Sequence, residues 1–312
     1  MGRDVVLLFA GQGAQAVGMG ADLMQEDAPT RERFETASAL LGYDLAAVMR
    51  DGPIEELTRT SRCQPALYLH GLSCWDLLRQ RVPDLNVVAC AGLSLGEFTA
   101  HAVAGTYEPM AGLELVAKRG LFMEQAAQEN DGSMAAMIGG DDRDIEALAK
   151  ECGVEVANYN APGQTVLSGP REGIRDAISK GKSYGVMMAT ELQVAGAYHS
   201  RLMRGAQEKL SETLAKVPMK SPECPVICNL EAREVSSPAD IRDTLTKQVT
   251  GSVRWSASMS LLLARGHRTF VELGPGGVLA GLMRRIDRSV KVMSARDWAT
   301  IGSTAERLNG IS

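Results

Sequence analysis

AGLSLGEFTA, residues 91–100, contains the pattern G-x-S-x-G at Gly92, Ser94 and Gly96. An apolar run over 85–91 precedes it, and residues 95–104 favour a helix. A strand, a tight turn and a helix in this order would hold Ser94 at the top of a sheet with its hydroxyl exposed. The glycines would let the backbone of a strained turn pass close to its neighbours. The stretch therefore predicts an α/β fold built around a nucleophilic serine.

The same pattern also arises by chance, because only three of its five positions are fixed. Gly71-Leu72-Ser73 matches its first half inside an apolar run over 66–78 that favours a plain helix. The match at 92–96 is the stronger one, since the segments on both sides suit a strand and a helix.

Composition indicates an ordinary globular protein. The chain has 312 residues, 45% hydrophobic and 23% charged, enough for one large domain or two smaller ones. A net charge of −5 argues against nucleic-acid binding, and no apolar run is long enough to span a membrane. The apolar part of residues 1–10 is too short for a signal peptide, and Asp4 lies where basic residues belong. We expect residues 5–10 to be the first buried strand of a cytoplasmic protein.

Six cysteines are present, and their spacing predicts neither disulfides nor a metal centre. Cys224 and Cys228 are four apart, with no histidine or second cysteine pair nearby, so a zinc site is not expected. Reduced thiols are the default for a chain without a secretion signal.

Short apolar segments alternate with helical periodicity along the chain. Strands are expected at 5–10, 87–91, 134–138, 154–158, 165–168, 186–192, 226–229 and 269–272, and helices at 29–50, 64–80, 95–104, 110–127, 200–216 and 255–265. This alternation favours a parallel sheet covered by helices on both faces. Residues 133–194 follow the order β-α-β-β-α-β, which is the ferredoxin-like split unit, with a hairpin turn at 160–163.

The predicted architecture is therefore a hydrolase-like large domain with a parallel sheet and an inserted ferredoxin-like small domain. The large domain would comprise residues 1–130 and 196–312, and the small domain residues 131–195. A cleft between them is a common place for a small-molecule site.

A serine nucleophile needs a base, and the chain has four histidines. His70 lies in an apolar helix, and His101 would lie about 10 Å from Ser94, two turns along the following helix. His267 lies in a polar turn. His199 lies where the inserted segment returns to the main domain, so it is the best candidate by elimination.

The loop after the first strand allows two interpretations. Residues 9–16 can be aligned with the dinucleotide fingerprint G-x-G-x-x-A, but no second strand ending in an acidic residue follows. Alternatively, a backbone N–H of this loop faces Ser94 and forms half of an oxyanion hole.

Seven motifs occur in one order along the chain: Gly11-Gln12-Gly13-Ala14-Gln15, Gly92-Leu93-Ser94-Leu95-Gly96-Glu97, Lys118-Arg119-Gly120, Asn158-Tyr159-Asn160-Ala161-Pro162-Gly163-Gln164, Tyr198-His199-Ser200, Gln248 and Glu272-Leu273-Gly274-Pro275-Gly276. Together they resemble the malonyl-CoA:acyl carrier protein transacylases and the acyltransferase domains of fatty acid and polyketide synthases. The resemblance runs from residue 5 to about residue 290.

The resemblance implies a role for each matching residue. Ser94 would be the nucleophile, His199 its base, and the backbone carbonyl of Gln248 would orient the imidazole. Backbone N–H groups of Gln12 and Leu95 would form the oxyanion hole. Arg119 would bind the malonyl carboxylate, a role that suits the two parallel donors of a guanidinium. Without the resemblance, a solvated helix arginine is the expected state of Arg119.

Further contacts with the substrate are expected from Leu93, Tyr198 and Asn160. Leu93 departs from the family pattern, since most members have histidine before the serine. Discrete acyltransferases that serve polyketide synthases in trans can have leucine there, so the pathway stays open. The ring of Tyr198 beside His199 would leave little room for an α-methyl branch.

The resemblance implies ping-pong transfer of malonyl from malonyl-CoA to the phosphopantetheine thiol of an acyl carrier protein. No cofactor or metal is expected, because one thioester is exchanged for another. A cytoplasmic monomer is expected, with neither a nucleic acid nor a membrane as partner. The rivals are a serine thioesterase or other hydrolase, a nicotinamide-dependent oxidoreductase built on residues 5–16, and a non-catalytic binding module.

Overall fold

A parallel sheet forms the centre of the computed structural model, which describes residues 3–310. Its strands lie in the order β10-β9-β1-β2-β7-β8. All neighbouring pairs are parallel except β7 and β8. The bounds are β1 Arg3–Phe9, β2 Leu85–Gly92, β7 Val226–Ile227, β8 Glu234–Val235, β9 Phe270–Leu273 and β10 Val292–Ala295.

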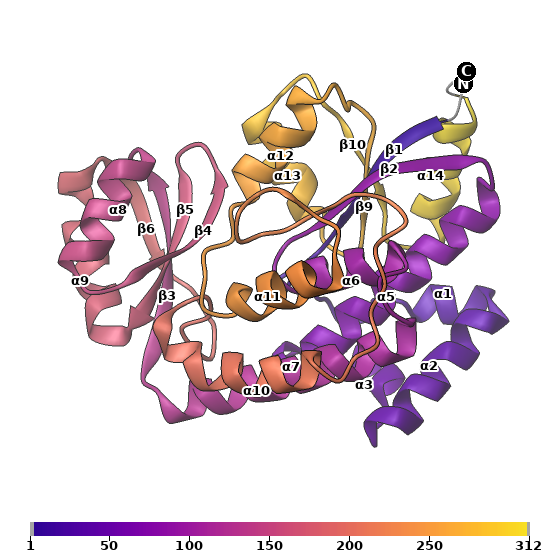
Figure 1. The fold of residues 1–312 in the computed structure, drawn as a ribbon, viewed down its shortest axis with the longest axis horizontal. Coiled ribbons are helices and arrows are strands. Elements are labelled where there is room, and N and C mark those ends of the chain that lie inside the picture. The colour runs from indigo at the N-terminus through magenta and orange to yellow at the C-terminus, as the bar shows by residue number, and fades with distance from the viewer. Residues whose placement is uncertain (1–2, 311–312) are drawn as a thin grey trace.

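Helices cover both faces of this sheet (Figure 1). The helices outside residues 132–191 are α1 Ala21–Glu26, α2 Ala28–Leu41, α3 Leu45–Asp51, α4 Ile54–Thr58, α5 Thr60–Arg81, α6 Leu95–Val103, α7 Pro109–Glu129, α10 Arg204–Leu214, α11 Pro238–Gln248, α12 Trp255–Ala264, α13 Val278–Ile286 and α14 Trp298–Asn309. None of the helices in residues 3–310 has the length and hydropathy that a membrane crossing requires.

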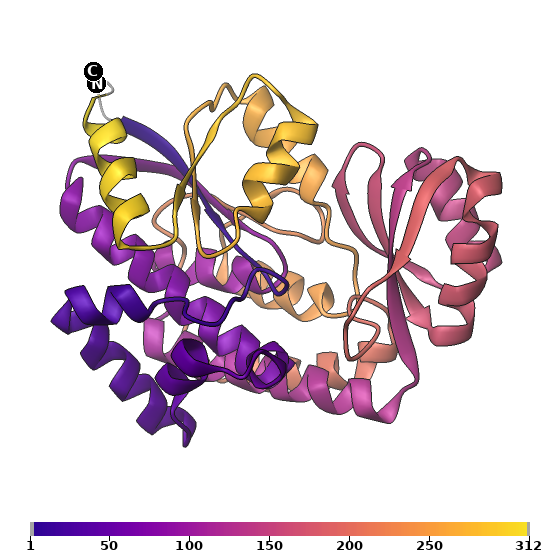
Figure 2. The ribbon, with the colours of Figure 1, turned by 180° about the vertical axis from the view of Figure 1, so that it is seen from behind.

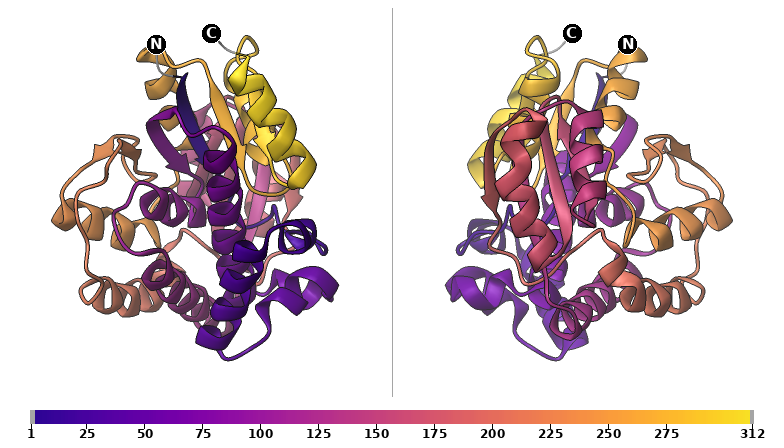
Figure 3. Two further views of the ribbon diagram at one scale, coloured as in Figure 1. Left: turned by 90° about the vertical axis from the view of Figure 1, so that its right-hand side faces the viewer. Right: turned by 90° about the vertical axis from the view of Figure 1, so that its left-hand side faces the viewer.

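Strand β1 is buried on both faces, which explains its unbroken apolar sequence. Val5, Leu7 and Phe9 pack in one core cluster with residues of α5 and α14, while Val6 and Leu8 pack in another with residues of α12 and α13. Figure 2 and Figure 3 show α14 and the α12–α13 pair on opposite sides of the strands. This two-sided burial confirms the predicted α/β class.

A second, antiparallel sheet lies at one end of the molecule, at the left of Figure 1. Its strand order is β4-β5-β3-β6. The order of elements is β3 Gly132–Gly139, α8 Asp142–Glu151, β4 Glu155–Ala161, β5 Gln164–Pro170, α9 Arg171–Lys180 and β6 Val186–Glu191. This is the β-α-β-β-α-β arrangement that the sequence predicts, with all three strand pairs antiparallel.

The domain limits at 130/131 and 195/196 stay predictions, and residues 1–2 and 311–312 of the expected large domain lie outside the described residues. Two backbone hydrogen bonds join the small sheet to the loop before α12. The N–H of Tyr159 donates to Val253 O at 2.9 Å, and the N–H of Val253 donates to Ala157 O at 2.8 Å. These bonds fix the small sheet beside the carboxyl end of the parallel strands.

Several predicted elements differ from the structure. The helix expected over 29–50 is two helices, because Gly42 takes a left-handed conformation and Asp44 caps the N-terminus of α3. The helix expected from residue 200 begins at Arg204, after a 3-10 turn at 201–203. The strand expected at 226–229 ends at Ile227. No expected element corresponds to strands β8 and β10 or to helices α1, α4, α11, α13 and α14.

Candidate active site

Ser94 lies in a tight turn between β2 and α6. Its backbone has φ 52° and ψ −102°, an unfavourable conformation for a residue with a side chain. The turn needs both flanking glycines. A Cβ on Gly92 would lie 1.9 Å from the carbonyl carbon of Gly96, and a Cβ on Gly96 would lie 2.1 Å from Phe9 O. The turn is therefore a nucleophile elbow of the geometry that G-x-S-x-G predicts.

Asn229, just after β7, holds this turn from the side. Its Nδ2 donates to Gly92 O at 2.7 Å, and its Oδ1 accepts from the Ser94 N–H at 2.6 Å. One buried amide thus binds the backbone on both sides of residue 93. These two bonds stabilise the strained conformation of Ser94.

His199 faces the Ser94 hydroxyl. Its Nε2 lies 2.8 Å from Ser94 Oγ, and its Nδ1 lies 2.8 Å from Gln248 O and 3.1 Å from Gly251 O. Because carbonyl oxygens only accept, Nδ1 carries the proton and Nε2 is free to take the proton of Ser94. Burial, with the nearby charge of Arg119, lowers the pKa of His199 to about 4. The imidazole is therefore neutral at physiological pH, as a general base must be.

Arg119, in the middle of α7, is 1% exposed and reaches the same serine. Its Nη2 donates to Ser94 Oγ at 3.0 Å and to Gln248 Oε1 at 3.0 Å, while its Nη1 donates to Gln64 Oε1 at 2.7 Å. Burial lowers its pKa to about 10, so the guanidinium stays charged at neutral pH. The solvated state that the sequence alone favours for Arg119 is wrong. The cation lies inside the site and has only neutral acceptors among these partners.

A cavity of about 380 Å³ opens onto Ser94, His199 and Arg119. Its wall includes Gln12 and Leu95, whose N–H groups are the expected oxyanion donors. Leu95 is the first residue of α6, where a backbone N–H has no partner within the helix. A donor at this position is available to an oxygen in the cavity.

The other predicted substrate contacts, Leu93, Tyr198 and Asn160, line the same cavity. The hydroxyl of Tyr198 lies 2.5 Å from Thr60 Oγ1, which fixes the ring beside His199. The Oδ1 of Asn160 is buried and has no hydrogen-bond partner among the described residues.

The remaining histidines take no part in this arrangement. His101 is buried, and its Nδ1 lies 3.1 Å from Thr106 Oγ1. His70 is also buried, as expected of a core residue, with Nδ1 3.5 Å from Cys74 Sγ. Its hydrogen-bonding capacity is only partly used, because its Nε2 has no partner among the described residues. His267 lies half-buried in the turn before β9.

The loop after β1 forms part of the cavity at Ser94, and it does not belong to a dinucleotide-binding βαβ unit. Gln12, Gly13 and Gln15 line the cavity around Ser94. Helices α1 to α5 follow this loop, and the next strand is β2, which leads to Ser94. The βαβ unit with an acidic residue about 20 positions on, which ribose binding requires, is therefore missing from the described chain.

The comparison with known families agrees with this geometry. A model of the acyl transferase domain matches residues 6–305. The chain belongs to the acyl transferase domain family. It is an acyltransferase enzyme, as the motifs predict.

Three relatives of this acyl transferase are similar over nearly their whole length. The malonyl CoA-acyl carrier protein transacylase of Bacillus subtilis is 37% identical over 307 residues, which are 95% of each chain. The structure of the malonyl CoA-acyl carrier protein transacylase of Coxiella burnetii has a TM-score of 0.95 at 33% identity, covering 99% of this chain and 98% of that one. A malonyl-transacylase solved in complex with its type II polyketide synthase acyl carrier protein has a TM-score of 0.93 at 33% identity, covering 97% and 99%.

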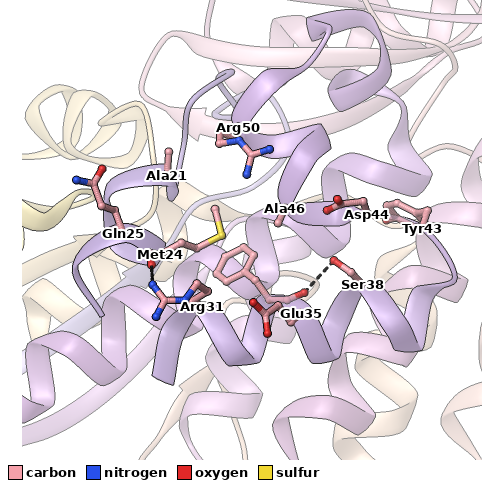
Figure 4. A pocket seen from close by; sticks show the side chains of 11 residues that line it. Ala21, Met24, Gln25, Arg31, Glu35, Ser38, Tyr43, Asp44, Ala46 and Arg50 are labelled. Carbon is pink, nitrogen blue, oxygen red and sulfur yellow. Dashed lines mark hydrogen bonds between the residues drawn. The ribbon is translucent and has the colours of Figure 1, made fainter. Parts of the chain in front are cut away.

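A second cavity in the acyl transferase, of about 720 Å³, is larger but offers no comparable chemistry. It lies between α1, α2 and α3 (Figure 4) and shares no lining residue with the cavity at Ser94. Its serine, Ser38, donates to Phe34 O, and no histidine lines it. This serine therefore has no base in the cavity.

Two site residues of the acyl transferase were not predicted, Asn229 and Glu97. Asn229 is expected only as the end of a strand. Glu97 is expected as a helix residue and as the last residue of the motif around Ser94, without a role of its own. Glu97 is wholly buried, and its Oε2 accepts from the Gln248 side chain at 2.6 Å and from the Asn229 N–H at 3.0 Å. The sequence contains part of the evidence for Glu97, because this residue directly follows the G-x-S-x-G pattern. A charged residue at the start of a buried helix needs hydrogen-bond partners.

Proposed function

We propose that the chain transfers a malonyl group from malonyl-CoA to the phosphopantetheine thiol of an acyl carrier protein. One observation carries the proposal: a buried arginine, Arg119, donates to the oxygen of the nucleophile itself, at 3.0 Å. A fixed cation at this place favours an acyl group that ends in a carboxylate, which a guanidinium binds in a bidentate manner. The names of the relatives support the same donor and acceptor.

In the first half-reaction, His199 Nε2 removes the proton of Ser94 as Oγ attacks the thioester carbon. The N–H groups of Gln12 and Leu95 stabilise the oxyanion, and Gln248 O and Gly251 O hold the imidazolium through Nδ1. The carbon–sulfur bond breaks, and coenzyme A leaves as a thiol with the proton from His199. The enzyme keeps the malonyl group as an ester on Ser94.

In the second half-reaction, the carrier thiol gives its proton to His199 and attacks this ester. The ester bond to Ser94 Oγ breaks, and the proton returns to that oxygen. A thioester is consumed and a thioester is formed, so neither a nucleotide nor a metal is needed to drive the exchange. Arg119 holds the carboxylate in both steps and keeps the malonyl group in one orientation.

We expect the carrier protein to dock through an acidic surface against basic residues of α13 and of the turn after it. Val278 and Leu282 of this helix line the cavity at Ser94, and Arg284, Arg285 and Arg288 lie beyond them along the chain. Lys180 and Lys182, which the sequence offers as further candidates, lie on the small sheet's side of the molecule. Lys180 pairs with Glu151 at 2.9 Å, so we leave it out of this surface.

The pathway that receives the malonyl group depends on the carrier. Leu93 before the nucleophile supports a discrete acyltransferase that serves a polyketide synthase in trans. The alternative is fatty acid synthesis. A malonyl-transacylase of similar structure has been solved with a polyketide carrier.

We further propose that the enzyme acts as a monomer in the cytoplasm. One chain supplies the nucleophile, its base, the acceptors of the imidazole and the cation, so no second copy is needed to complete the site. All six cysteines are free thiols, and Cys90 Sγ lies only 3.6 Å from Cys224 Sγ, which supports a reducing compartment.

A transfer assay tests the function against its nearest rival, hydrolysis by the same serine. The enzyme is incubated with malonyl-CoA and a carrier protein that has, or lacks, its phosphopantetheine arm. Malonyl should appear only on the carrier protein that has its phosphopantetheine arm, with little free malonate when no carrier is present. Rapid release of malonate without a carrier would favour the hydrolase.

A further inference from the structure

Glu97 is a buried carboxylate for which the reaction above has no use. It lies in the first turn of α6, three residues after Ser94, and is 0% exposed. Its Oε2 accepts two hydrogen bonds, from Gln248 Nε2 at 2.6 Å and from the N–H of Asn229 at 3.0 Å. Its Oε1 has no partner among the described residues. Burying a carboxylate with one oxygen unpaired is costly, so its place needs an explanation.

The side-chain amide of Gln248 has a different partner at each end. Its Oε1 accepts from Arg119 Nη2 at 3.0 Å, and its Nε2 donates to Glu97 Oε2 and to Ser94 O, the latter at 3.0 Å. The two ends of a terminal amide have nearly the same shape and differ only in donating or accepting. If the amide flipped, its N–H groups would meet the Arg119 guanidinium, and its oxygen would meet two acceptors.

We propose that Glu97 is a positioning residue for acyl-group selection: it fixes the orientation of the Gln248 amide, which then holds the Arg119 guanidinium beside Ser94. The inference rests on the proposed function, since it takes Arg119 as the partner of the malonyl carboxylate. The side chain of Glu97 does not line the cavity, and its hydrogen bonds are to Gln248 and Asn229, with none to Ser94 Oγ. It acts through Gln248. Burial raises the pKa of Glu97 to about 7, but Oε2 accepts in either protonation state, because the proton of the neutral form is accommodated on the unpaired Oε1. An oxygen that only accepts admits one orientation of the amide.

The same oxygen of Glu97 also links Arg119 to the turn at Ser94. The N–H of Asn229 donates to it, and the side chain of Asn229 holds Gly92 O and the Ser94 N–H. The nucleophile and the guanidinium are therefore both held through one acceptor. This arrangement keeps the distance between Ser94 Oγ and the Arg119 guanidinium constant. The malonyl group has a fixed length between its ester carbon and its carboxylate, so binding both ends requires that constant distance.

Three variants at position 97 distinguish the positioning of the Gln248 amide from a purely structural role of Glu97. Glu97→Gln can keep an oxygen in place of Oε2, and its N–H2 then replaces only the unpaired Oε1. Glu97→Met has a similar length but no comparable acceptor, so the Gln248 amide can flip. Glu97→Asp keeps a carboxylate but withdraws it by one methylene, which makes it the second test if Glu97→Met does not fold.

The measured quantity is the ratio of malonyl to acetyl loading, each as kcat/KM from malonyl-CoA and acetyl-CoA. Glu97→Met and Glu97→Asp should lower this ratio by about tenfold or more, the effect of losing one buried hydrogen bond to a charged group. Glu97→Gln should restore the ratio to within about threefold of the wild type, since its acceptor survives. Acetyl loading should fall less than malonyl loading, because the acetyl group makes no use of Arg119.

Glu272 provides a matched control. It is also 0% exposed and accepts two backbone N–H groups, from Leu279 and Ala280, both at 2.9 Å. Glu272→Met should lower the melting temperature and both loading rates in parallel, with the ratio unchanged. If Glu97→Met and Glu97→Asp behave in the same way, Glu97 is a structural residue and the inference is wrong.

The two proposals fail in different ways. A wild-type enzyme that does not load malonyl at all contradicts the proposed function. A wild-type enzyme that loads malonyl selectively, with the same selectivity in all three Glu97 variants, contradicts only the role of Glu97.

Discussion

The imidazole of His199 is buried beside the charge of Arg119, and these two effects oppose its protonation more strongly than the carbonyls of Gln248 and Gly251 favour it. Its pKa, lowered from 6.5 to about 4 by burial and by Arg119, predicts an unusual pH profile. Malonyl loading, measured as kcat/KM by rapid quench, should stay constant as the pH falls through 6.5 and should reach half its value at a pH of about 4. A midpoint near 6.5 would mean that the base titrates as a solvated histidine.

The same shift has a consequence for folding. The unfolded chain binds a proton at His199 below pH 6.5, whereas the folded chain binds it only below about 4. The free energy of unfolding should therefore decrease as the pH falls through this window, by the contribution of this one group. Denaturation of wild type and His199→Ala between these pH values should show a shallower decrease in the variant. Equal slopes would contradict the buried, neutral state of His199.

Arg119 makes the rate of transfer depend on the charge of the acyl group. Arg119→Ala should weaken malonyl transfer by the cost of a broken buried charge pair, on the order of 2–5 kcal/mol in activation free energy. The acetyl group has no carboxylate, so the rate of acetyl transfer should not fall in this way. Side-by-side loading of the variant with malonyl-CoA and acetyl-CoA measures the difference. A parallel decline of both, together with the melting temperature, would remove Arg119 from substrate binding.

At this scale, the sequence predicts the residues that a linear motif marks and misses those defined by tertiary packing. Ser94 is marked by its glycines, and His199 remains after the other histidines are excluded. The carbonyl of Gln248 and the cation of Arg119 were expected only from the family resemblance. Nothing local distinguishes Arg119 from a solvated arginine. Asn229 and Glu97 were missed because their partners lie more than 130 residues away in the chain.

The turn between β2 and α6 depends on close backbone packing. Gly92→Ala would place a Cβ 1.9 Å from Gly96 C, so the turn should open and both stability and loading should be lost. Gly205, in α10, serves as the matched control, because a Cβ added there would meet no atom within 4 Å. Gly205→Ala should be neutral or more stable by about 0.5–1 kcal/mol, because alanine favours a helix. Thermal unfolding and loading of both variants provide the comparison, and a stable, active Gly92→Ala would contradict the elbow geometry.

Helix α13 should contribute to one half-reaction only. Replacing Arg284 and Arg285 with glutamate should slow transfer to the carrier protein and reduce its dependence on salt, while loading from malonyl-CoA changes less. Arg175→Glu on α9 adds the same kind of charge to the small domain and should leave both half-reactions near the wild type. An equal loss in Arg175→Glu, or an equal salt dependence of the two half-reactions, would exclude a specific surface on α13.

Elements with clear periodicity were predictable, and those defined by pairing or capping were not. The β-α-β-β-α-β order was visible because its strands alternate with amphipathic helices. The break between α2 and α3 depends on the left-handed Gly42, which an unbroken helical pattern conceals. Strands β8 and β10 have two and four residues and owe their existence to neighbours in the sheet. Helix α14 begins with a capping box at Asp297 and Thr300, which is a local signal for the start of a helix.

In the whole molecule, the site gathers residues from distant parts of the chain around the end of β2. Ser94 follows that strand, Arg119 comes from α7, Gln248 ends α11, and His199 lies between β6 and α10. The bonds between the small sheet and Val253 lie close in sequence to Gly251, whose carbonyl helps to hold His199. Residues of the small sheet also line the cavity, so the sheet contributes to the site and is tied to the loop that orients the base.

The central claim is a malonyl ester on Ser94, and intact mass spectrometry tests it most directly. Wild type and Ser94→Ala are each incubated with malonyl-CoA, weighed and digested. The wild type should gain one malonyl group on the peptide that contains Ser94, and should lose it when armed carrier protein is added. Ser94→Ala should gain none. Equal labelling of Ser94→Ala, or transfer to the carrier by a wild type that never becomes labelled, would contradict the account.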